Sequence, residues 1–331
     1  MSNADKDVLI IGAGVTGAVI AATLAEAGMK VALLDATSVG GGATRRAMGI
    51  ATLDPREAHV AETAHGLALL KQLAQRRGAL LHTTPALHLA TSPEREAALR
   101  EVASAHNASQ LEWIADASRL PQGFAGGLLA HDSALVDLDL LLMRLLQHPN
   151  IIVRQEVEVF DLQFIHDGTV VMGRGYTVHA RRVVLATNAY AGLLSPYLSE
   201  SVRIARGMTF TSHPLNGAAQ SILHALPILV NDAGLMLAPA RESRIKAAAW
   251  SWQETETDPY FMLRAFLRRL DGDLSQQAAE WRAGVTTVTD DGAPLVGQLA
   301  GEGNVTYALG LGPFGLAWAP IVAERIAALI R

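Results

Sequence analysis

Three glycines and one aspartate near the N-terminus have the residue types and the spacing that bind a dinucleotide. Gly12, Gly14 and Gly17 follow the apolar run Val8–Ile11, and Asp35 closes a second apolar run after an alanine-rich segment. This is the strand, glycine turn, helix, strand and acid of the dinucleotide fingerprint. The helix N-terminus receives phosphate charge, and the acid accepts hydrogen bonds from a ribose diol. The pattern indicates a dinucleotide site without distinguishing NAD from FAD.

Arginine and glycine gather directly after this fingerprint. The next segment contains Gly40–Gly42, then Thr44, Arg45 and Arg46, and then Gly49. A glycine-rich segment of this kind can be a flexible surface loop. Because it adjoins a nucleotide motif, its paired arginines favour contacts with a pyrophosphate or a ring.

Hydrophobic periodicity gives the elements that would position these residues. We expect helices at Pro55–Arg77, Pro93–His106, Val136–Gln147 and Asp258–Leu270. We expect strands at Leu87–Ala90 and Ile151–Val159, a buried strand that enters a polar turn within Arg182–Tyr190, and alternating strands within Ile204–Thr211 and Gly234–Trp252. The chain ends in a strand, a glycine-rich turn and a long helix, which are expected to complete the sheet that begins at Val8. The prediction is an α/β fold with a second layer of antiparallel strands.

Alternation within one of these strands separates two sets of side chains. Lys246, Ala248, Trp250 and Trp252 are expected on one face, and Ile245, Ala247 and Ala249 on the other.

Histidines give no metal site in this pattern. His59 and His65 lie on one predicted helix with a spacing that is poor for sharing a metal ion, so we expect both side chains to be exposed. No arrangement of serine, histidine and acid suggests nucleophilic catalysis either.

Composition excludes several classes of function. The chain has 331 residues, half of them hydrophobic, and a net charge of −5 without a basic run, which argues against a nucleic-acid surface. The absence of cysteine excludes disulfides, a thiolate nucleophile and a cysteinyl-linked flavin. We expect the polar N-terminus not to be a signal peptide, and the uncharged stretch Val305–Ala323 contains glycines and prolines that favour a buried helix over a membrane span. A cytoplasmic protein is expected.

Beyond the fingerprint, the chain resembles the D-amino-acid oxidase/glycine oxidase family of FAD-dependent oxidoreductases over nearly its whole length. The resemblance is carried by GAGVTG with Asp35, GGGATRRAMGI, RVVLATNAY, IARGM, TDDGAPLVG and LGLGPFGL. It implies FAD as the cofactor, because NAD enzymes share only the first of these motifs.

The resemblance also implies roles for individual residues. The ADP part of FAD would lie against Gly12, Ala13, Gly14, Val15, Thr16, Gly17, Asp35 and Ala36. The pyrophosphate and ring would be lined by Thr44, Arg45, Arg46, Ala47 and Gly49, together with Ala186, Thr187 and Asn188. Adenine would meet the backbone of Val159, or of Val157 in an alternative register. A helix N-terminus at Gly312, Pro313, Phe314, Gly315 and Leu316 would stabilise negative charge on the reduced flavin. Some relatives attach flavin to a histidine where this chain has Arg46, so non-covalent FAD is expected.

The chain departs from the family where substrate carboxylates are bound. The position of the usual arginine before the TxDGxP motif is Thr286, and Arg282 lies over 10 Å away along a strand. Leu235, Met236 and Leu237 stand where a tyrosine is common. We therefore expect a more apolar pocket, with Met48, Met236, Trp250 and Thr286 contacting the substrate.

Lys246 is the candidate catalytic residue. It falls where monomeric sarcosine oxidase, a relative, has a lysine that promotes the reaction of flavin with oxygen, because a cation stabilises superoxide-like charge. A strand lysine that points to water is the alternative.

The resulting prediction is a Rossmann-like FAD-binding domain (1–80, 131–203 and 284–331) with a discontinuous antiparallel-sheet substrate domain (81–130 and 204–283). The expected reaction is oxidation of a C–N bond in an amino-acid-like or secondary amine, with hydride transfer to flavin N5 and with oxygen or another acceptor as partner. Two alternatives are a flavin-dependent dehydrogenase of another substrate, such as a hydroxy acid, and a flavin-holding subunit of a larger complex.

Overall fold

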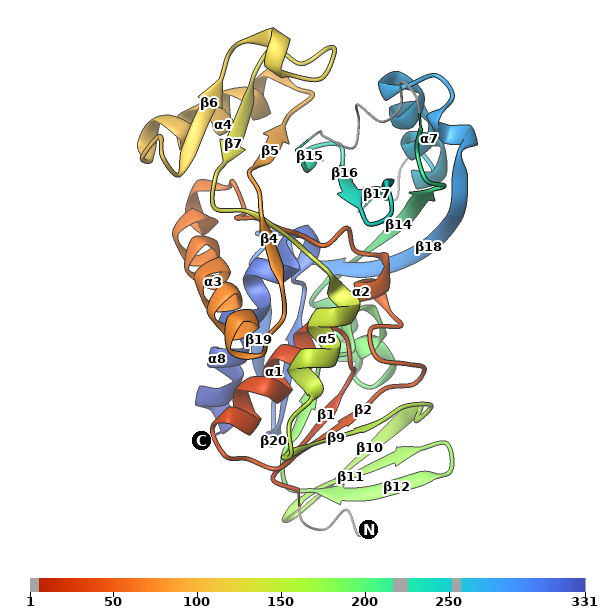
Figure 1. The fold of residues 1–331 in the computed structure, drawn as a ribbon. Helices are drawn as coiled ribbons and strands as arrows, with labels where there is room; N and C mark the ends of the chain where they lie inside the picture. Colours follow the sequence, from red (N-terminus) through yellow and green to blue (C-terminus); the bar gives the residue numbers. More distant parts are fainter. Residues whose placement is uncertain (1–5, 217–225, 252–256, 331) are drawn as a thin grey trace.

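Two large sheets organise the chain (Figure 1). The structure is a computed structural model that describes residues 6–216, 226–251 and 257–330. Among these residues, the first sheet has six strands and is mostly parallel, and the second has eight strands and is mostly antiparallel. The predicted α/β class is confirmed. Trp252, which we expected on a strand face, lies outside the described residues.

The six-stranded sheet contains the N-terminal strand at its centre. In spatial order its strands are β19 (Leu295–Leu299), β20 (Glu302–Leu309), β13 (Val183–Leu185), β1 (Val8–Ile11), β2 (Val31–Leu34) and β9 (Ile151–Arg154). All four residues of β1 are buried and apolar, as expected for a parallel strand covered on both faces. β20 pairs in parallel with β13, so the C-terminal region completes this sheet as predicted.

Helices cover one face of this sheet. They are α1 (Val15–Glu26), α3 (Glu57–Arg76), α5 (Leu138–Leu146) and α8 (Gly315–Ile330). A Cβ atom at Gly66 would lie 1.9 Å from the carbonyl oxygen of Ala317, so only glycine lets α3 approach α8 this closely. The tight packing fixes the N-terminus of α8 over the sheet.

A small antiparallel sheet covers the opposite face, and it lies at the bottom of Figure 1. Its strands are β10 (Val159–Ile165), β11 (Gly168–Gly173) and β12 (Tyr176–Ala180). Leu162 and Val171 share a buried cluster with Leu9 and Leu34 of the six-stranded sheet. The parallel sheet is therefore buried between two layers.

The eight-stranded sheet is assembled from two separate parts of the chain. In order its strands are β18 (Ala278–Val288), β14 (Arg203–Ser212), β17 (Arg244–Ser251), β16 (Leu235–Ala240), β15 (Ile228–Val230), β5 (Ala86–Leu89), β7 (Gly127–Ala130) and β6 (Leu111–Ile114). Three parallel register pairs, beginning with Ile228 opposite Leu87, join β15 to β5. These pairs connect the two parts into one continuous sheet.

The two faces of this sheet differ as the alternation predicts. Ile245, Ala247 and Ala249 share a buried cluster with α7 (Pro259–Leu270), whereas Ala248 and Trp250 belong to another cluster with Met236 and Trp318. The helix α4 (Pro93–Ala105) packs on β6 and β7. One face therefore carries a helix, and the other turns toward the six-stranded half of the molecule.

Short elements connect the two halves. A three-stranded sheet contains β3 (Ile50–Ala51), β8 (Ala134–Val136) and β4 (Leu81–Thr83). The single-turn helices α2 (Ala43–Arg46) and α6 (Pro196–Glu200) lie in the loops that follow β2 and β13.

The prediction of one strand at Ile151–Val159 was wrong in its extent. β9 ends at Arg154, and the chain turns at Glu156, whose φ is 60°. Val159 then begins β10 in a different sheet. The alternation of apolar residues continues from β9 through Val157 to Val159, so the sequence contains no indication of the turn.

The helix predicted at Val136–Gln147 begins two residues later than expected. Val136 pairs with Leu81 in the small sheet. Asp137 caps the helix, because its Oδ1 accepts a hydrogen bond of 3.0 Å from the backbone N–H of Leu140.

One helical stretch among the described residues, Gly312–Ile330, is long and apolar enough to cross a membrane. Within its apolar window 67% is buried inside the protein, and α8 contacts α1 and α3. Core helices pass the same test of length and composition, and the packing of α8 is that of a core helix.

Candidate active site

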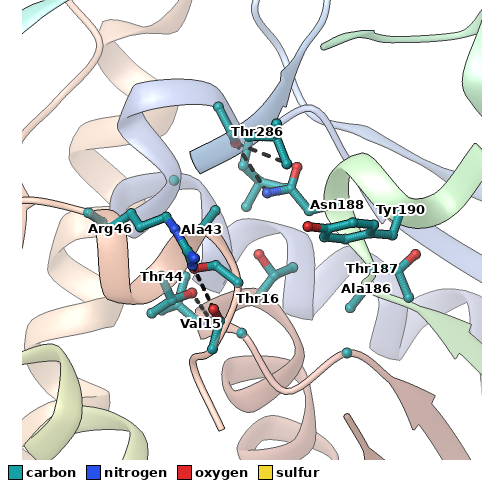
Figure 2. Close-up of a pocket in the computed structure, with 18 of the residues that line it drawn as sticks. Val15, Thr16, Ala43, Thr44, Arg46, Ala186, Thr187, Asn188, Tyr190 and Thr286 are labelled. Atoms are coloured by element: carbon teal, nitrogen blue, oxygen red, sulfur yellow. Dashed lines mark hydrogen bonds between the residues drawn. The ribbon is translucent and has the colours of Figure 1, made fainter. Parts of the chain in front are cut away.

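A cavity of about 570 Å³ is lined by residues from both large sheets. On one side it meets the ends of β1, β2 and β13, and on the other it meets Met236 and Trp250. Figure 2 shows the side that carries the turn after β1, the loop around α2 and the turn after β13. The carboxyl edge of a parallel sheet is where α/β proteins bind ligands.

The glycine turn after β1 is shaped by close backbone contacts. Gly12 has a φ of +107°, and a Cβ atom there would lie 2.4 Å from the carbonyl oxygen of Ala186. A Cβ atom at Gly17 would lie 1.9 Å from the carbonyl oxygen of Gly12. Both positions therefore require glycine, and α1 can start directly against β1.

The Asp35 carboxylate holds this turn in place. It lies at the carboxyl end of β2 and accepts hydrogen bonds from the N–H of Ala13 at 2.8 Å and the N–H of Thr37 at 2.9 Å. Asp35 also lines the cavity. A carboxylate has about four acceptor sites, so capacity remains for a ribose diol.

The loop after β2 closes over the start of α1. Thr44 Oγ1 accepts a hydrogen bond of 2.9 Å from the N–H of Val15, the first residue of α1 (Figure 2). Arg46 donates to the carbonyl oxygens of Gly41, Gly42 and Ala283 at 2.6–2.7 Å. Arg46 therefore joins the glycine loop to β18 of the other sheet.

The turn after β13 is tied to the same strand. Asn188 has a φ of 50°, and its Oδ1 accepts hydrogen bonds from the N–H and the hydroxyl of Thr287. Its Nδ2 donates to Thr286 Oγ1 at 3.1 Å (Figure 2). Both polar atoms of the Asn188 side chain are therefore hydrogen-bonded within the protein. Beside it, Thr187 Oγ1 is buried without a hydrogen-bond partner and belongs to a residue that lines the cavity.

Most residues that the resemblance assigned to the cofactor line this one cavity. They are Gly12, Gly14, Val15, Thr16, Asp35, Ala36, Thr44, Arg46, Ala47, Gly49, Val159, Ala186, Thr187, Asn188, Gly312, Pro313, Gly315 and Leu316. Val157 lines it as well, so both registers proposed for the adenine contact reach the cavity.

Four assigned residues lie outside the lining. Ala13 and Gly17 shape the turn from behind, and Phe314 is buried and stacks on His88 with ring centroids 6.2 Å apart. Arg45 is half exposed, with its Nε 3.8 Å from Asp139 Oδ1. Of the arginine pair, only Arg46 lines the cavity.

The four residues expected to contact substrate, Met48, Met236, Trp250 and Thr286, all line the cavity. Lys246 does not. It is half-buried on the same strand face as Trp250, but the two are four positions apart, which is about 13 Å along a strand.

His59 was predicted to be exposed, and that prediction was wrong. Its side chain is buried, with Nδ1 3.0 Å from a carboxylate oxygen of Asp54. Asp54 is itself fully buried and also pairs with Arg56. Arg56 donates to the carbonyl of Asp291 at 2.8 Å, so the cluster anchors the start of α3 to the turn after β18. His65 is exposed as predicted.

His88 is a buried histidine that sequence reasoning missed. Its Nε2 lies 3.0 Å from Thr52 Oγ1, and its Nδ1 lies 3.4 Å from Asn231 Oδ1. Burial lowers the pKa of His88 from 6.5 to about 4. It therefore stays neutral between β5 and the ring of Phe314.

Tyr190 and Leu193 also line the cavity and were not assigned by sequence. Both are exposed large side chains on the 3₁₀ turn Asn188–Leu193. Tyr190 is the last residue of the RVVLATNAY motif, so this motif could have identified it as a residue of the site.

Comparison with known sequences decides the family. The model of the DAO family, described as FAD dependent oxidoreductase, matches residues 7–329. The chain belongs to this family of FAD-dependent oxidoreductases.

The curated proteins that match this chain are longer than the chain itself. The tRNA 5-methylaminomethyl-2-thiouridine biosynthesis bifunctional protein MnmC of Marinobacter nauticus is 27% identical over 359 residues, covering 97% of this chain and 54% of that protein. The protein of the same name from Thiobacillus denitrificans is 25% identical and is covered over 57% of its length. The chain spans about half the length of the curated relatives it matches.

Solved structures share the fold. Glycine oxidase from Geobacillus kaustophilus superposes with a TM-score of 0.80 at 21% identity, covering 98% of this chain and 94% of that one. L-proline dehydrogenase from P. horikoshii gives 0.79 at 18% identity, with coverage of 98% and 93%. Iminodiacetate oxidase from Chelativorans sp. BNC1 gives 0.76 at 20% identity, with coverage of 98% and 95%.

The residues of the cavity fit the cofactor that the family name implies. Gly12 and Gly14 line the cavity without side chains, and in the first turn of α1 the N–H of Val15 donates to Thr44 whereas that of Thr16 has no intrahelical partner. The unpaired hydroxyl of Thr187 and the remaining acceptor capacity of Asp35 add polar partners. Such a donor and acceptor set suits a pyrophosphate and a ribose.

Proposed function

We propose that the protein uses non-covalent FAD to oxidise a C–N bond of a secondary amine or an amino-acid-like amine. One observation carries the proposal: a continuous cavity joins the dinucleotide turn and Asp35 to the apolar face around Met236 and Trp250. The family supplies the cofactor class. The names of the structural relatives, which include glycine oxidase, L-proline dehydrogenase and iminodiacetate oxidase, supply the substrate class.

The chain would hold each part of FAD with a different group of residues. Asp35 would accept hydrogen bonds from the ribose, and the first turn of α1 with Thr187 would bind the pyrophosphate. The residues Gly312–Leu316 would place a helix N-terminus beside the ring, where its dipole stabilises negative charge. Bound flavin would supply the hydride acceptor.

The apolar residues opposite would orient the substrate and exclude water. Met48, Met236 and Trp250 have no group that titrates near neutral pH, so these side chains would not act as acids or bases. Their contribution would be to hold a neutral amine in a dry site with its C–H bond directed at the ring.

Several features support non-covalent attachment. The chain has no cysteine, and Arg46 occupies the place where some relatives carry the attaching histidine. Its hydrogen bonds to three carbonyl oxygens hold its guanidinium in the loop. Precipitation of the purified protein with acid should leave the yellow colour in the supernatant, and colour retained in the pellet would contradict this.

We also propose the division into two domains given by the sequence. Residues 1–80, 131–203 and 284–331 would form the FAD-binding domain, and 81–130 with 204–283 the substrate domain. The strands β5, β6, β7 and β14–β17, with most of β18, fall in the second group.

The decisive experiment is anaerobic reduction of the purified holoprotein with a panel of amines, amino acids and hydroxy acids. Bleaching of the flavin by amines supports the proposal. Bleaching only by hydroxy acids would replace it with the dehydrogenase alternative, and no bleaching by any compound would favour a flavin-holding subunit. Hydrogen peroxide on return to air identifies oxygen as the acceptor.

The names of the curated relatives refer to tRNA, and we propose a small-molecule amine for this chain instead. Its net charge of −5 and the absence of a basic run give no electrostatic footprint for a nucleic acid. Bulk tRNA should therefore not compete with the amine for reduction of the flavin, and competition at low salt would contradict a small-molecule substrate.

A further inference from the structure

Trp250 lies on a surface from which two side chains are missing. In the eight-stranded sheet, Gly207 of β14 is paired with Trp250 of β17 on one side and with Gly284 of β18 on the other. Three adjacent strands thus place one tryptophan beside two glycines in a single row.

The indole occupies the space that a side chain at Gly207 would fill. A Cβ atom at Gly207 would lie 2.3 Å from Cε3 of Trp250 and 2.6 Å from both Cδ2 and Cζ3. Similar distances to three atoms of the benzene ring mean that the ring lies across the backbone of Gly207. A Cβ atom at Gly284 would lie 3.4 Å from Cη2 of Trp250, so the ring reaches toward the third strand.

Arg46 holds the far end of this row. A Cβ atom at Gly284 would lie 2.5 Å from Cδ of Arg46, whose Nε donates to the carbonyl of Ala283 at 2.6 Å. One face of the indole is therefore occupied by sheet backbone, while the residue also lines the cavity. The surface that it offers there is the remaining aromatic face and edge.

Arg46 is the charged lining residue at this end of the cavity. Among the described lining residues the charged side chains are Asp35, Arg46 and Glu158, and Asp35 and Glu158 belong to the side of the cavity formed by β2 and the turn before β10. Arg46 already donates to three carbonyl oxygens. The face of an indole carries negative electrostatic potential, so it attracts ammonium groups and planar rings and repels carboxylates.

We propose that Trp250, seated on Gly207, is the specificity-determining residue, and that it selects amines with a flat apolar substituent. This inference rests on the proposed function. It goes further by naming the substituent and the residue that receives it, in contrast to substrates such as the glycine and iminodiacetate in the names of the structural relatives.

The test is a binding comparison on the holoprotein under anaerobic conditions. N-methylbenzylamine and N-methylcyclohexanemethylamine share a secondary amine and differ chiefly in that only the first has a flat aromatic ring. Their dissociation constants can be measured by calorimetry or from the flavin absorbance. We expect N-methylbenzylamine to bind at least tenfold more tightly. Equal binding, tighter binding of the cyclohexyl compound, or no binding of either compound overturns the proposal.

Variants assign the effect to the indole. Trp250→Ala should weaken N-methylbenzylamine binding about tenfold, Trp250→Phe should weaken it less, and Gly207→Ala should weaken it by displacing the ring. Phe261→Ala, at an exposed residue on α7, is the matched control and should bind like the wild type. Trp250→Phe and Gly207→Ala keep the test valid if Trp250→Ala fails to fold. Unchanged affinity in folded variants rejects the role of Trp250.

Failure of the two proposals is distinguishable. If N-methylbenzylamine binds through Trp250 but no amine reduces the flavin, then the specificity surface stands and amine oxidation fails. If glycine or another small amino acid reduces the flavin while N-methylbenzylamine does not bind, then amine oxidation stands and the specificity surface fails.

Discussion

The two sides of the cavity are built by opposite means. The cofactor side is made from backbone, since Gly12 and Gly17 meet carbonyl oxygens and Asp35 binds the N–H of Ala13. The substrate side is made from side chains, with Met236 and Trp250 on a regular sheet. Backbone contacts leave little room for substitution, whereas side chains on a sheet can be exchanged. The comparison predicts that substitutions on the first side affect folding and cofactor retention, and that those on the second affect selectivity and rate.

The largest effect is expected at the crossing of α1 and β1. Gly17→Ala places a Cβ atom 1.9 Å from the carbonyl oxygen of Gly12, which only movement of the helix can relieve. We expect a loss of about 4 kcal/mol or more in the free energy of unfolding, together with loss of FAD. Denaturant titration measures the first and flavin absorbance the second. Gly272→Ala is the control, because nothing lies within 4 Å of its added Cβ; equal stability of the two variants would contradict the argument.

A smaller effect is expected from Asp35→Ala. The substitution leaves the N–H of Ala13 without its acceptor and removes the proposed ribose partner. Together these should weaken FAD binding by about tenfold to a hundredfold, or roughly 1–3 kcal/mol. Dialysis followed by flavin fluorescence of the released fraction measures the change. Asp161→Ala, in the small covering sheet, is a suitable control, and FAD retention equal to wild type in Asp35→Ala would rule out the ribose contact.

Next in size is the pH dependence contributed by His88, which is buried on β5 against the ring of Phe314. The pKa of His88 is lowered from 6.5 to about 4, so below pH 6.5 the unfolded chain binds a proton that the native protein does not. Stability therefore falls on acidification, by about 1.4 kcal/mol per pH unit, or about 2 kcal/mol at pH 5. The variant His88→Gln lacks this loss.

The measurement is chemical denaturation of wild type and His88→Gln at pH 7 and pH 5. The exposed His65 provides the control, since His65→Gln should keep the wild-type pH dependence. Identical pH dependence in wild type and His88→Gln would show that the buried site accepts a proton as readily as water does.

The smallest effect is expected at Lys246. It tests whether a residue outside the cavity lining still acts on the reaction at the substrate side. Lys246 shares a strand face with Trp250 but lies outside the cavity lining. If its charge acts on the reaction with oxygen, Lys246→Met should slow the reoxidation of anaerobically reduced flavin by about tenfold, without slowing reduction by substrate. Stopped-flow mixing with oxygen measures this. An unchanged reoxidation rate would show that the charge of Lys246 has no role in the reaction with oxygen.

Local sequence was sufficient for the cofactor side of the site. Gly17 and Asp35 contact Gly12 and Ala13 within one strand, turn, helix and strand, so their spacing predicted their arrangement. The motifs around Arg46 and Thr187 likewise brought most of their residues to the same cavity.

The rest depends on contacts between distant segments. His88 is buried because Asn231, far along the chain, lies beside it, and no periodicity signals such a partner. The pairing of β5 with β15 and the register that sets Gly207 beside both Trp250 and Gly284 are also properties of the assembled sheet. The sequence predicted which face Trp250 occupies, but not the surface on which it lies.

The row of Gly207, Trp250 and Gly284 has a consequence for how relatives of this protein can change. A side chain at Gly207 requires a smaller residue at position 250, whereas a side chain at Gly284 would meet Arg46. Changes at positions 207 and 250 should therefore be correlated, with tryptophan at 250 found together with glycine at 207. A lineage that acquires a new substrate through this surface would have to pass through the small residue at 250 first, and the order of those steps is set by steric exclusion.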